Sequence, residues 1–455
     1  MLEGLEVREV DISKLQENKD FRTDSQFYTR EFKKNPNLNY TKIGNIIKSS
    51  QYGISIGMNE DGKGYPIYRM NEIHNMLCDL TVEKYADISK EEYEKFALHN
   101  GDVLFNRTNS FEWVGRTGIY YQNDDVNRTF ASYLVKFIPD ENIVLPEYLC
   151  AFLNSKFGMW DIKRRARQSI NQTNVNPEEV KEIEIPLLSM DFQSKIKDCL
   201  AKSNKLRIEA NNCYLDADRI LSEELGVHKL KIDHSPISIK QIQESFLKSG
   251  RLDSEYYLKR YEDYTKAIQA YHGGYDVLPN ICQINDTLFN PQRSTTYKYV
   301  ELNDIGLNGD ITGCITSLGK DLPSRARRII MSGEIILSSI EGSLQSVAMV
   351  NEEYHQAICS TGFYRLLPHG INAETLLLLL KSDPIQIQLK QNCSGTILTA
   401  INRNDLQRII LPKIVEPIQN EIAIYVQKSV SLRQQAKQLL EDAKHMVEFE
   451  IEKKL

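Results

Sequence analysis

The feature that most constrains this chain is an internal repeat that links its two halves. Four residues recur 229 positions apart: Arg22, Asp24, Ser25 and Tyr28 match Arg251, Asp253, Ser254 and Tyr257. A longer pattern recurs 226 positions apart: Lys202-Ser203-x-x-Leu206-Arg207-x-x-Ala210 returns as Lys428-Ser429-x-x-Leu432-Arg433-x-x-Ala436. Solenoid and propeller repeats have periods of roughly 20 to 50 residues. A repeat this long therefore predicts two complete domains of one kind.

The repeat covers scaffold positions and leaves the segments between them unmatched. At a shift of 232, Gly101-Asp102-Val103 matches Gly333-Glu334-Ile335. Most of the matching positions are apolar residues, Gly or Pro, whereas residues 105–130 and 337–358 share little. We therefore expect one scaffold, used twice with different loops, to serve two similar targets or partners.

Each half is expected to be an α+β domain followed by a long helix. Runs of β-branched and aromatic residues predict short strands at 133–137, 183–185 and 409–411. Shorter helices are predicted at 146–153 and 373–381. The resulting division has four regions: a first domain at 1–188, a helical region at 189–228, a second domain at 229–414 and a C-terminal helical region at 415–455.

The two long helices are predicted from apolar residues that fall on one stripe, over about 191–225 and 416–452. Gly226 stands at a C-cap position of the first, and Pro417 stands near the start of the second. A helix of this length, roughly 50 Å, cannot hide its stripe locally, so an antiparallel pair of the two helices is expected. The alternative is that each helix lies flat on its own domain.

Composition and charge exclude several classes of protein. The 455 residues are 41% hydrophobic, and no apolar run approaches the ~20 residues that a membrane span needs. The N-terminus lacks the basic and apolar regions of a signal peptide, and the eight cysteines form no C-x-x-C pair, so reduced thiols and a cytoplasmic location are expected. The net charge of −6 argues weakly against nonspecific polyanion binding.

Motifs for catalysis and for metal binding are missing. The sequence has no G-x-x-x-x-G-K-[ST] loop, no G-x-G-x-x-G, no H-E-x-x-H and no G-x-S-x-G. Asn290-Pro291-Gln292-Arg293 begins like the Asn-Pro-Pro-aromatic motif of adenine methyltransferases but lacks the second Pro and the aromatic residue. We predict no catalytic residue, no metal site and no cofactor held by this chain.

The unmatched segments are instead rich in side chains that bind nucleic acid. Arg pairs with guanine and Asn or Gln with adenine, whereas Ser, Thr and Lys mostly hold phosphate. The candidates in the first half are Arg69, Asn106, Arg107, Thr108, Asn109, Arg116, Arg164, Arg165, Arg167, Gln168, Asn171 and Gln172. Those in the second half are Arg293, Ser294, Lys298, Arg325, Arg327, Arg328, Ser338, Ser339, Gln345 and Ser346. The alternative for each one is an ordinary solvated polar group.

In the order of its motifs, the chain resembles the specificity (S) subunits of type I restriction–modification systems. The resemblance lies in the paired turns Gly101-Asp102-Val103-Leu104 and Gly333-Glu334-Ile335-Ile336, and in the segments from Asn176 to Pro186 and from Asn402 to Pro412, each followed by a long helix. It implies a non-catalytic subunit with two target recognition domains, each of which reads half of a split double-stranded DNA sequence. The helical regions would form an antiparallel coiled coil that sets the unread gap.

The resemblance also implies partners and their cofactors. Two methyltransferase (M) subunits, which hold S-adenosylmethionine, would dock on the helical regions. Restriction/translocase (R) subunits, which use ATP and Mg, would join the complex. Because Arg107 is followed by an insert with Trp113 while the second half has Ser338-Ser339, we expect two unlike half-sites. Residues 229–250 have no N-terminal twin and are expected to be a linker.

Two other functions remain open from the sequence. The chain could be a protein-interaction scaffold, such as an orphan or regulatory subunit whose domains no longer read DNA. It could also be an independent nuclease or methyltransferase, which the missing motifs disfavour.

Overall fold

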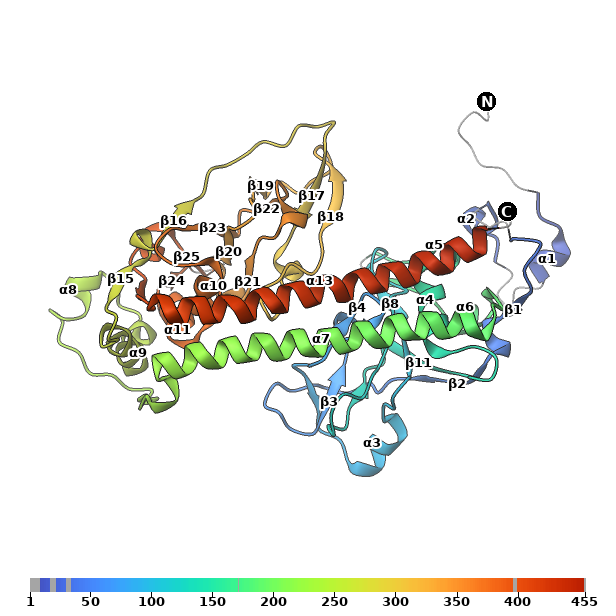
Figure 1. Ribbon diagram of the computed structural model, residues 1–455, viewed down its shortest axis with the longest axis horizontal. Helices are drawn as coiled ribbons and strands as arrows, with labels where there is room; N and C mark the ends of the chain where they lie inside the picture. Colours follow the sequence, from blue (N-terminus) through green and yellow to red (C-terminus); the bar gives the residue numbers. More distant parts are fainter. Residues whose placement is uncertain (1–8, 17–21, 30–33, 171, 396–398, 454–455) are drawn as a thin grey trace. The chain divides into compact units, whose positions relative to one another are not determined.

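The computed structural model of the protein describes residues 9–16, 22–29, 34–170, 172–395 and 399–453. Its internal contacts divide the chain into two compact units. Unit 1 comprises residues 1–208 and 433–455, and unit 2 comprises residues 209–432. Each unit contains one mixed α/β domain and parts of two long helices, which Figure 1 draws in green and red. The α+β class predicted from the sequence is confirmed.

Unit 1 is built on a six-stranded sheet and also contains three smaller sheets. The order of the main sheet is β2–β11–β7–β9–β5–β4, at Ile47–Tyr52, Leu134–Pro139, Val103–Asn106, Thr117–Ile119, Leu77–Cys78 and Ile73–His74. A second sheet has the order β10–β3–β6, at Thr129–Phe130, Tyr65–Tyr68 and Tyr85–Ala86. A two-stranded antiparallel sheet is formed by β1 (Tyr40–Lys42) and β14 (Glu184–Pro186). The central β7 is buried at every residue because it is covered on both faces.

Unit 2 repeats the core of this strand order, with four strands in place of six in its main sheet and four in place of three in its second sheet. Its main sheet has the order β16–β23–β20–β21, at Cys282–Asn285, Phe363–Pro368, Ile335–Ser338 and Val347–Met349. Its second sheet has the order β18–β17–β22–β19, at Ile315–Leu318, Thr296–Val300, Ile358–Ser360 and Ala326–Ile329. The pair β15 (Tyr275–Val277) and β26 (Ile410–Pro412) corresponds to β1 and β14. The parallel pair β10–β3 likewise has its counterpart in β17–β22. The internal repeat of the sequence is therefore a repeat of topology.

Two helices follow the last strand of the main sheet in each unit. They are α4 (Pro146–Asn154) and α5 (Lys156–Arg165) in unit 1, and α10 (Ala373–Lys381) and α11 (Asp383–Gln391) in unit 2. Each domain ends with a short helix, α6 (Pro177–Lys181) or α12 (Arg403–Leu406), whose N-cap is Asn176 or Asn402. Further short helices lie at α1 (Ile12–Gln16), α2 (Ser25–Thr29), α3 (Lys90–Phe96), α8 (Phe246–Ser249) and α9 (Lys259–Gln269).

The long helices are α7 (Met190–Leu225) and α13 (Glu416–Glu452), and they pair in antiparallel fashion. In unit 1 the start of α7, with Ile196 and Leu200, packs in one core with Leu440 and Val447 from the end of α13. In unit 2 the end of α7 packs with the start of α13, through Tyr214, Ala217, Leu221, Ile422 and Val426. The predicted pairing is confirmed, and each helix end also contributes to the core of its own unit.

The repeated Arg-x-Asp-Ser-x-x-Tyr motif performs the same structural task in both units. The Arg22 guanidinium pairs with Asp24 and donates hydrogen bonds to the carbonyls of Arg164 and Arg165, at the end of α5. Arg251 pairs with Asp253 and donates to the carbonyls of Gln391 and Cys393, at the end of α11. A cation suits the carbonyl end of a helix, because the helix dipole is negative there.

The repeated glycine turn places a buried carboxylate against a cation on the neighbouring strand. Gly101 and Gly333 both have positive φ, 90° and 86°, which glycine adopts without strain. In unit 1 Asp102 lies 3.5 Å from the Lys136 ammonium of β11. In unit 2 Glu334 makes a two-pronged contact with Arg365 of β23, at 2.8 and 3.0 Å.

The cysteines and the composition of the helices bear on the expected class of protein. All eight cysteines are free thiols, and six of them are buried. No helix within the described ranges combines the length and the apolar composition that a membrane crossing requires.

Candidate DNA-recognition surface

In unit 1 several sequence candidates lie together on a small sheet with the order β12–β13–β8. Its strands are Arg167–Gln168, Thr173–Asn174 and Thr108–Asn109. Gln168 pairs with Thr173, and Thr173 pairs with Asn109, so that these residues form one row across the sheet. The hairpin between β12 and β13 is closed by Ser169, whose N–H and hydroxyl both donate to the carbonyl of Gln172. Gln168 and Gln172 are exposed, and Asn171 lies outside the described residues.

Arg107 lies between the main sheet and this small sheet. Its N–H donates to the carbonyl of Tyr133 at 3.1 Å, and its carbonyl accepts from the N–H of Val175 at 2.9 Å. Its guanidinium lies over the Tyr52 ring, 5.1 Å from the centroid. The Tyr52 side chain is itself 47% exposed.

The loop that follows β8 is held by a lysine from α5. The Lys163 ammonium donates to the carbonyls of Glu112 and Val114 at 3.0 and 2.8 Å, and also to that of Phe111. Burial lowers the pKa of Lys163 to about 8. In the same loop the Arg116 guanidinium lies 3.5 Å from the centroid of the Trp113 ring. A loop tied at three carbonyls presents its side chains in a defined arrangement.

The basic cluster at the end of α5 is mostly neutralised within unit 1. Arg164 and Arg165 both pair with Asp161, and Arg165 is only 6% exposed. Arg167, whose side chain is 52% exposed, pairs with Glu179 at 2.7 Å. Arg164 also donates to the carbonyl of Phe27 and lies over the Phe27 ring.

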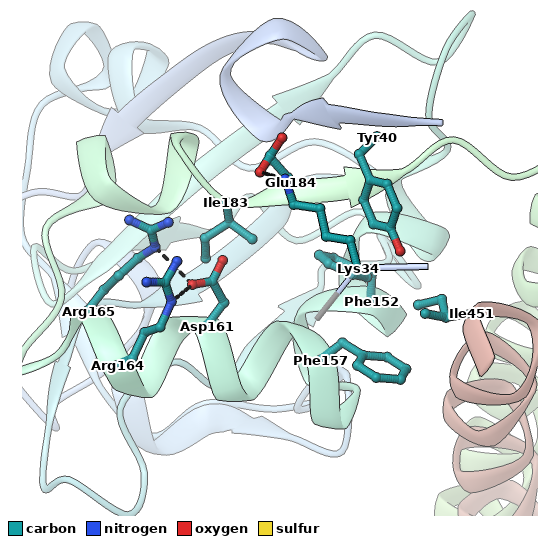
Figure 2. Close-up of a pocket in the computed structure, with 10 residues that line it drawn as sticks. All are labelled: Lys34, Tyr40, Phe152, Phe157, Asp161, Arg164, Arg165, Ile183, Glu184 and Ile451. Carbon is teal, nitrogen blue, oxygen red and sulfur yellow. Dashed lines mark hydrogen bonds and ion pairs between the residues drawn. The ribbon is translucent and has the colours of Figure 1, made fainter. Parts of the chain in front are cut away.

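Arg164 and Arg165 line a pocket that Figure 2 shows in close-up. Both guanidinium groups point toward Asp161, while an ion pair of Lys34 with Glu184 lies on another wall. The remaining lining is Tyr40 and the apolar side chains Phe152, Phe157, Ile183 and Ile451. The charges in this pocket thus have partners within unit 1.

Three other candidates of the first half make internal contacts. Arg69 pairs with Glu72, which also accepts from the Arg69 N–H at 2.7 Å. Asn106 is fully buried and accepts from the N–H of Thr108. The Thr108 hydroxyl donates to Asn174 at 2.6 Å. These contacts show structural tasks for the three side chains, and their contact with DNA stays a prediction.

In unit 2 the corresponding surface is built from other side chains. Strands β24 (Cys393–Ser394) and β25 (Ala400–Ile401) form the hairpin, and Ala400 makes a bridge to Ile340. Ser338 is fully buried and bonded to Ser343, while the Ser339 hydroxyl donates to the carbonyl of Gly362. Gln345 and Ser346 lie in the loop before β21, where Lys381 donates to the carbonyl of Gln345 at 2.8 Å. Burial lowers the pKa of Lys381 to about 8 as well.

The remaining candidates of unit 2 lie on and around the β18–β17–β22–β19 sheet. Arg293 and Ser294 are exposed, in the segment before β17. Lys298 donates to the carbonyl of Glu353 and lies near the Tyr354 ring. Three arginines around β19 have partners: Arg325 pairs with Glu301, Arg327 donates to Asn290 and to the carbonyl of Ser324, and Arg328 donates to the carbonyl of Phe363.

Tyr52 and Lys381 were not predicted to be parts of the surface, and Lys163 was considered only as a member of the basic run at 163–167. Tyr52 reaches Arg107 through strand pairing between segments far apart in the chain, and no local pattern marks this contact. The two lysines could have been suspected, because each stands near the end of a helix that follows the sheet. Within the part of the chain that the structure describes, no group of three or more His, Cys, Asp or Glu residues could hold a metal ion.

Comparisons with known proteins place residues 37–213 in a family described as the type I restriction modification DNA specificity domain. A protein of Methanocaldococcus jannaschii, assigned as the type I restriction enzyme MjaX specificity subunit, is 29% identical over 189 residues, which are 39% of this chain and 44% of that protein. The EcoKI specificity subunit of Escherichia coli is 24% identical over 172 residues, 37% of each chain. The chain thus spans less than half the length of these curated relatives.

Two solved structures align with most of the chain at low identity. A crystal structure of the type I restriction–modification S subunit from M. genitalium is 16% identical, with a TM-score of 0.40, over 91% of this chain and 97% of that one. The HsdS subunit from Thermoanaerobacter tengcongensis is 13% identical, with a TM-score of 0.31, over 93% of this chain and 99% of that one.

Proposed function

This chain belongs to the type I restriction–modification DNA specificity family, and on that premise we propose that it selects the DNA sequence for a methyltransferase and a restriction enzyme. Units 1 and 2 would each read one half of a split, asymmetric double-stranded target. The chain itself would be non-catalytic.

One observation carries the proposal of two unlike half-sites. Arg107 in unit 1 and Ser339 in unit 2 occupy the same backbone position. The N–H of each donates to a carbonyl just before the strand β11 or β23, that of Tyr133 or Gly362, and the carbonyl of each accepts from Val175 or Ile401. The same scaffold thus presents a guanidinium in one unit and a hydroxyl in the other. Two copies of one scaffold with different side chains at one position are suited to two different base sequences.

The division of labour follows from the chemistry of the side chains. Exposed cations such as Arg293 would hold phosphates and give salt-dependent affinity. Loop side chains would contact base edges in the major groove. The antiparallel pair of α7 and α13 would set the number of base pairs between the half-sites.

The partners would supply the chemistry. Two M subunits would dock on the helical regions and hold S-adenosylmethionine, and R subunits would use ATP and Mg. No residue of this chain would take part in the methyl transfer or in the cleavage of DNA.

Methylation mapping at base resolution tests the proposal. The full chain is co-expressed with the methyltransferase of its own system in a host without other adenine methylation. We expect N6-methyladenine in a split asymmetric motif that disappears when this chain is omitted. If the complex assembles but no motif depends on the chain, the scaffold function replaces the proposal.

A further inference from the structure

We propose that Arg107 contacts a guanine in the half-site read by unit 1, and that Tyr52 is the positioning residue for its guanidinium. This inference rests on the proposed function and assigns one position of the target to one side chain. It is carried by three features of Arg107: its fixed backbone, its lack of an acidic partner, and the ring beneath it.

The backbone of Arg107 is held from both sides. Its N–H and its carbonyl are bonded to Tyr133 and Val175, at 3.1 and 2.9 Å. The preceding Asn106 is fully buried, and the following Thr108 is bonded to Asn174. Binding through this side chain would not have to order the main chain first, which favours a specific contact over a loose one.

The charge of Arg107 is available, in contrast to that of its neighbours. Arg69, Arg164 and Arg167 pair with Glu72, Asp161 and Glu179. No ion pair or side-chain hydrogen bond joins Arg107 to any other described residue, and its Nε is buried without a partner. The two terminal nitrogens are left for a ligand, and they suit two acceptors that lie side by side.

Tyr52 gives the guanidinium a platform. The two groups are stacked with 5.1 Å between the guanidinium carbon and the ring centroid, and Tyr52 is held in β2 by pairing with Val135. Stacking on an aromatic face fixes the plane of an arginine while its edge stays open for hydrogen bonds. Guanine presents O6 and N7 as two adjacent acceptors in the major groove, and the two-pronged arginine contact with them is the commonest specific contact to a base.

Unit 2 gives the contrasting case. Ser339, at the same backbone position, has no guanidinium, and its hydroxyl is used in a bond to the carbonyl of Gly362. The geometry therefore predicts a fixed guanine in only one of the two half-sites at this position.

The test uses four variants of the full chain, each co-expressed with the methyltransferase of its system and mapped by base-resolution methylation sequencing. Arg107→Lys keeps the charge but removes the planar guanidinium that can donate two parallel hydrogen bonds. Tyr52→Leu removes the ring beneath an unchanged Arg107. Tyr52→Phe keeps the ring. Arg260→Lys is the matched control, because Arg260 also lies 5.1 Å from a tyrosine centroid, that of Tyr261, but on α9.

We expect Arg107→Lys and Tyr52→Leu to relax the same single position of one half-site, with the preference for guanine falling by roughly 5-fold to 150-fold. Tyr52→Phe and Arg260→Lys should keep the wild-type motif. The second half-site should stay intact in every variant, which shows in the same data that the chain has folded.

A second measurement uses the wild-type complex alone and so does not depend on the folding of a variant. The assigned guanine is replaced by 7-deazaguanine, which lacks the N7 acceptor, in a labelled duplex that carries the target. We expect the affinity to fall by several-fold to tenfold. Unchanged affinity would overturn the guanine contact.

Other outcomes separate the parts of the inference. If Arg107→Lys lowers methylation at all sites equally and leaves the motif unchanged, Arg107 holds a phosphate and the inference is wrong. If Tyr52→Leu keeps the motif while Arg107→Lys relaxes it, Tyr52 has no positioning role. If the wild-type chain itself specifies no motif, the proposed function fails, and this inference fails with it.

Discussion

The hydroxyl of Ser203 on α7 donates a hydrogen bond to the carbonyl of Ala436 on α13, at 2.8 Å. In unit 2 the same contact occurs with the helices exchanged, since Ser429 on α13 donates to the carbonyl of Ala210 on α7 at 2.6 Å. All four residues belong to the longer of the two repeated patterns, and both serines are buried. The repeated pattern therefore provides a buried hydrogen bond between the two long helices in each unit.

Replacement of either serine should weaken the helix pair. Ser203→Ala or Ser429→Ala removes a buried hydroxyl donor, and we expect a loss of about 1 kcal/mol in the free energy of unfolding for each. Thermal or urea unfolding of the full chain measures this. Ser194→Ala, on the exposed face of α7, is the matched control and should change the stability by less than about 0.5 kcal/mol. Equal losses of stability in the buried and the exposed variants would contradict a stabilising role of these hydrogen bonds.

The conformation of the loop held by Lys163 should require glycine at position 115. This residue has φ of +94°, and a Cβ added to it would lie 2.6 Å from Cγ2 of Ile162. Gly115→Ala should therefore cost about 3 kcal/mol, from left-handed strain and from the clash together. Gly62→Ala is the control, because Gly62 has φ of +75° in open space and should show only the strain, about 1 kcal/mol. Similar losses for the two variants in thermal unfolding would show that the clash relaxes freely.

Loss of the buried ion pair between Glu334 and Arg365 in unit 2 should destabilise the chain far more than loss of an exposed pair. Glu334→Gln leaves the buried Arg365 guanidinium without its counter-charge, and we expect a loss of about 3 kcal/mol. Glu209→Gln breaks the exposed pair with Lys428 and should have a much smaller effect on the free energy of unfolding. Urea titration of both variants gives the comparison. A small effect of Glu334→Gln would mean that water reaches the Arg365 side chain.

The scaffold was predictable from the sequence because its signals are local or repeated. The apolar stripes gave the long helices to within one residue, and Gly226 indeed has the left-handed conformation of a C-cap. The predicted strands at 133–137, 183–185 and 409–411 correspond to β11, β14 and β26 to within two residues. The division into four regions at 188, 228 and 414 stays a prediction.

The candidate surface was less predictable because its contacts are long-range. Asp161 stands three and four residues before Arg164 and Arg165, a helical spacing that could have indicated their ion pairs. The pairing of Arg167 with Glu179, and the stack of Arg107 on Tyr52, depend on tertiary structure. A basic run in a sequence therefore does not tell which of its charges are free to bind DNA.

The two lysines that hold the loops should make the stability of the chain depend on pH, whereas an exposed lysine should not. Burial lowers the pKa of Lys163 and Lys381 to about 8, from an ordinary value of 10.5. Between these two values the folded chain binds fewer protons than the unfolded chain, so each lysine makes the free energy of unfolding rise with pH. The difference in melting temperature between the wild type and Lys163→Met should therefore grow from about pH 7 to about pH 9.5. For the exposed Lys90→Met it should stay constant, and parallel curves for Lys163→Met would contradict the shifted pKa.

The length of the helix pair should determine the unread gap in the DNA target. The hydrogen bonds match residue 203 with 436 and residue 210 with 429, so residues 204–210 of α7 lie opposite residues 429–435 of α13. Deletion of both stretches removes matched heptads and keeps the remaining contacts in register. Seven helical residues span about 10 Å, which corresponds to about three base pairs.

We therefore expect the double deletion to shorten the preferred gap by about three base pairs and to leave both half-sites unchanged, as measured by methylation sequencing. Deletion of 204–210 alone would put the helices out of register and is the control, for which we expect loss of the complex. A double-deletion chain that still methylates the original gap with undiminished efficiency would show that the helix pair does not set the spacing. Relaxed half-sites with an unchanged gap would instead indicate damage to the domains, because Arg207, which donates to the carbonyl of Cys78, lies within the deleted stretch.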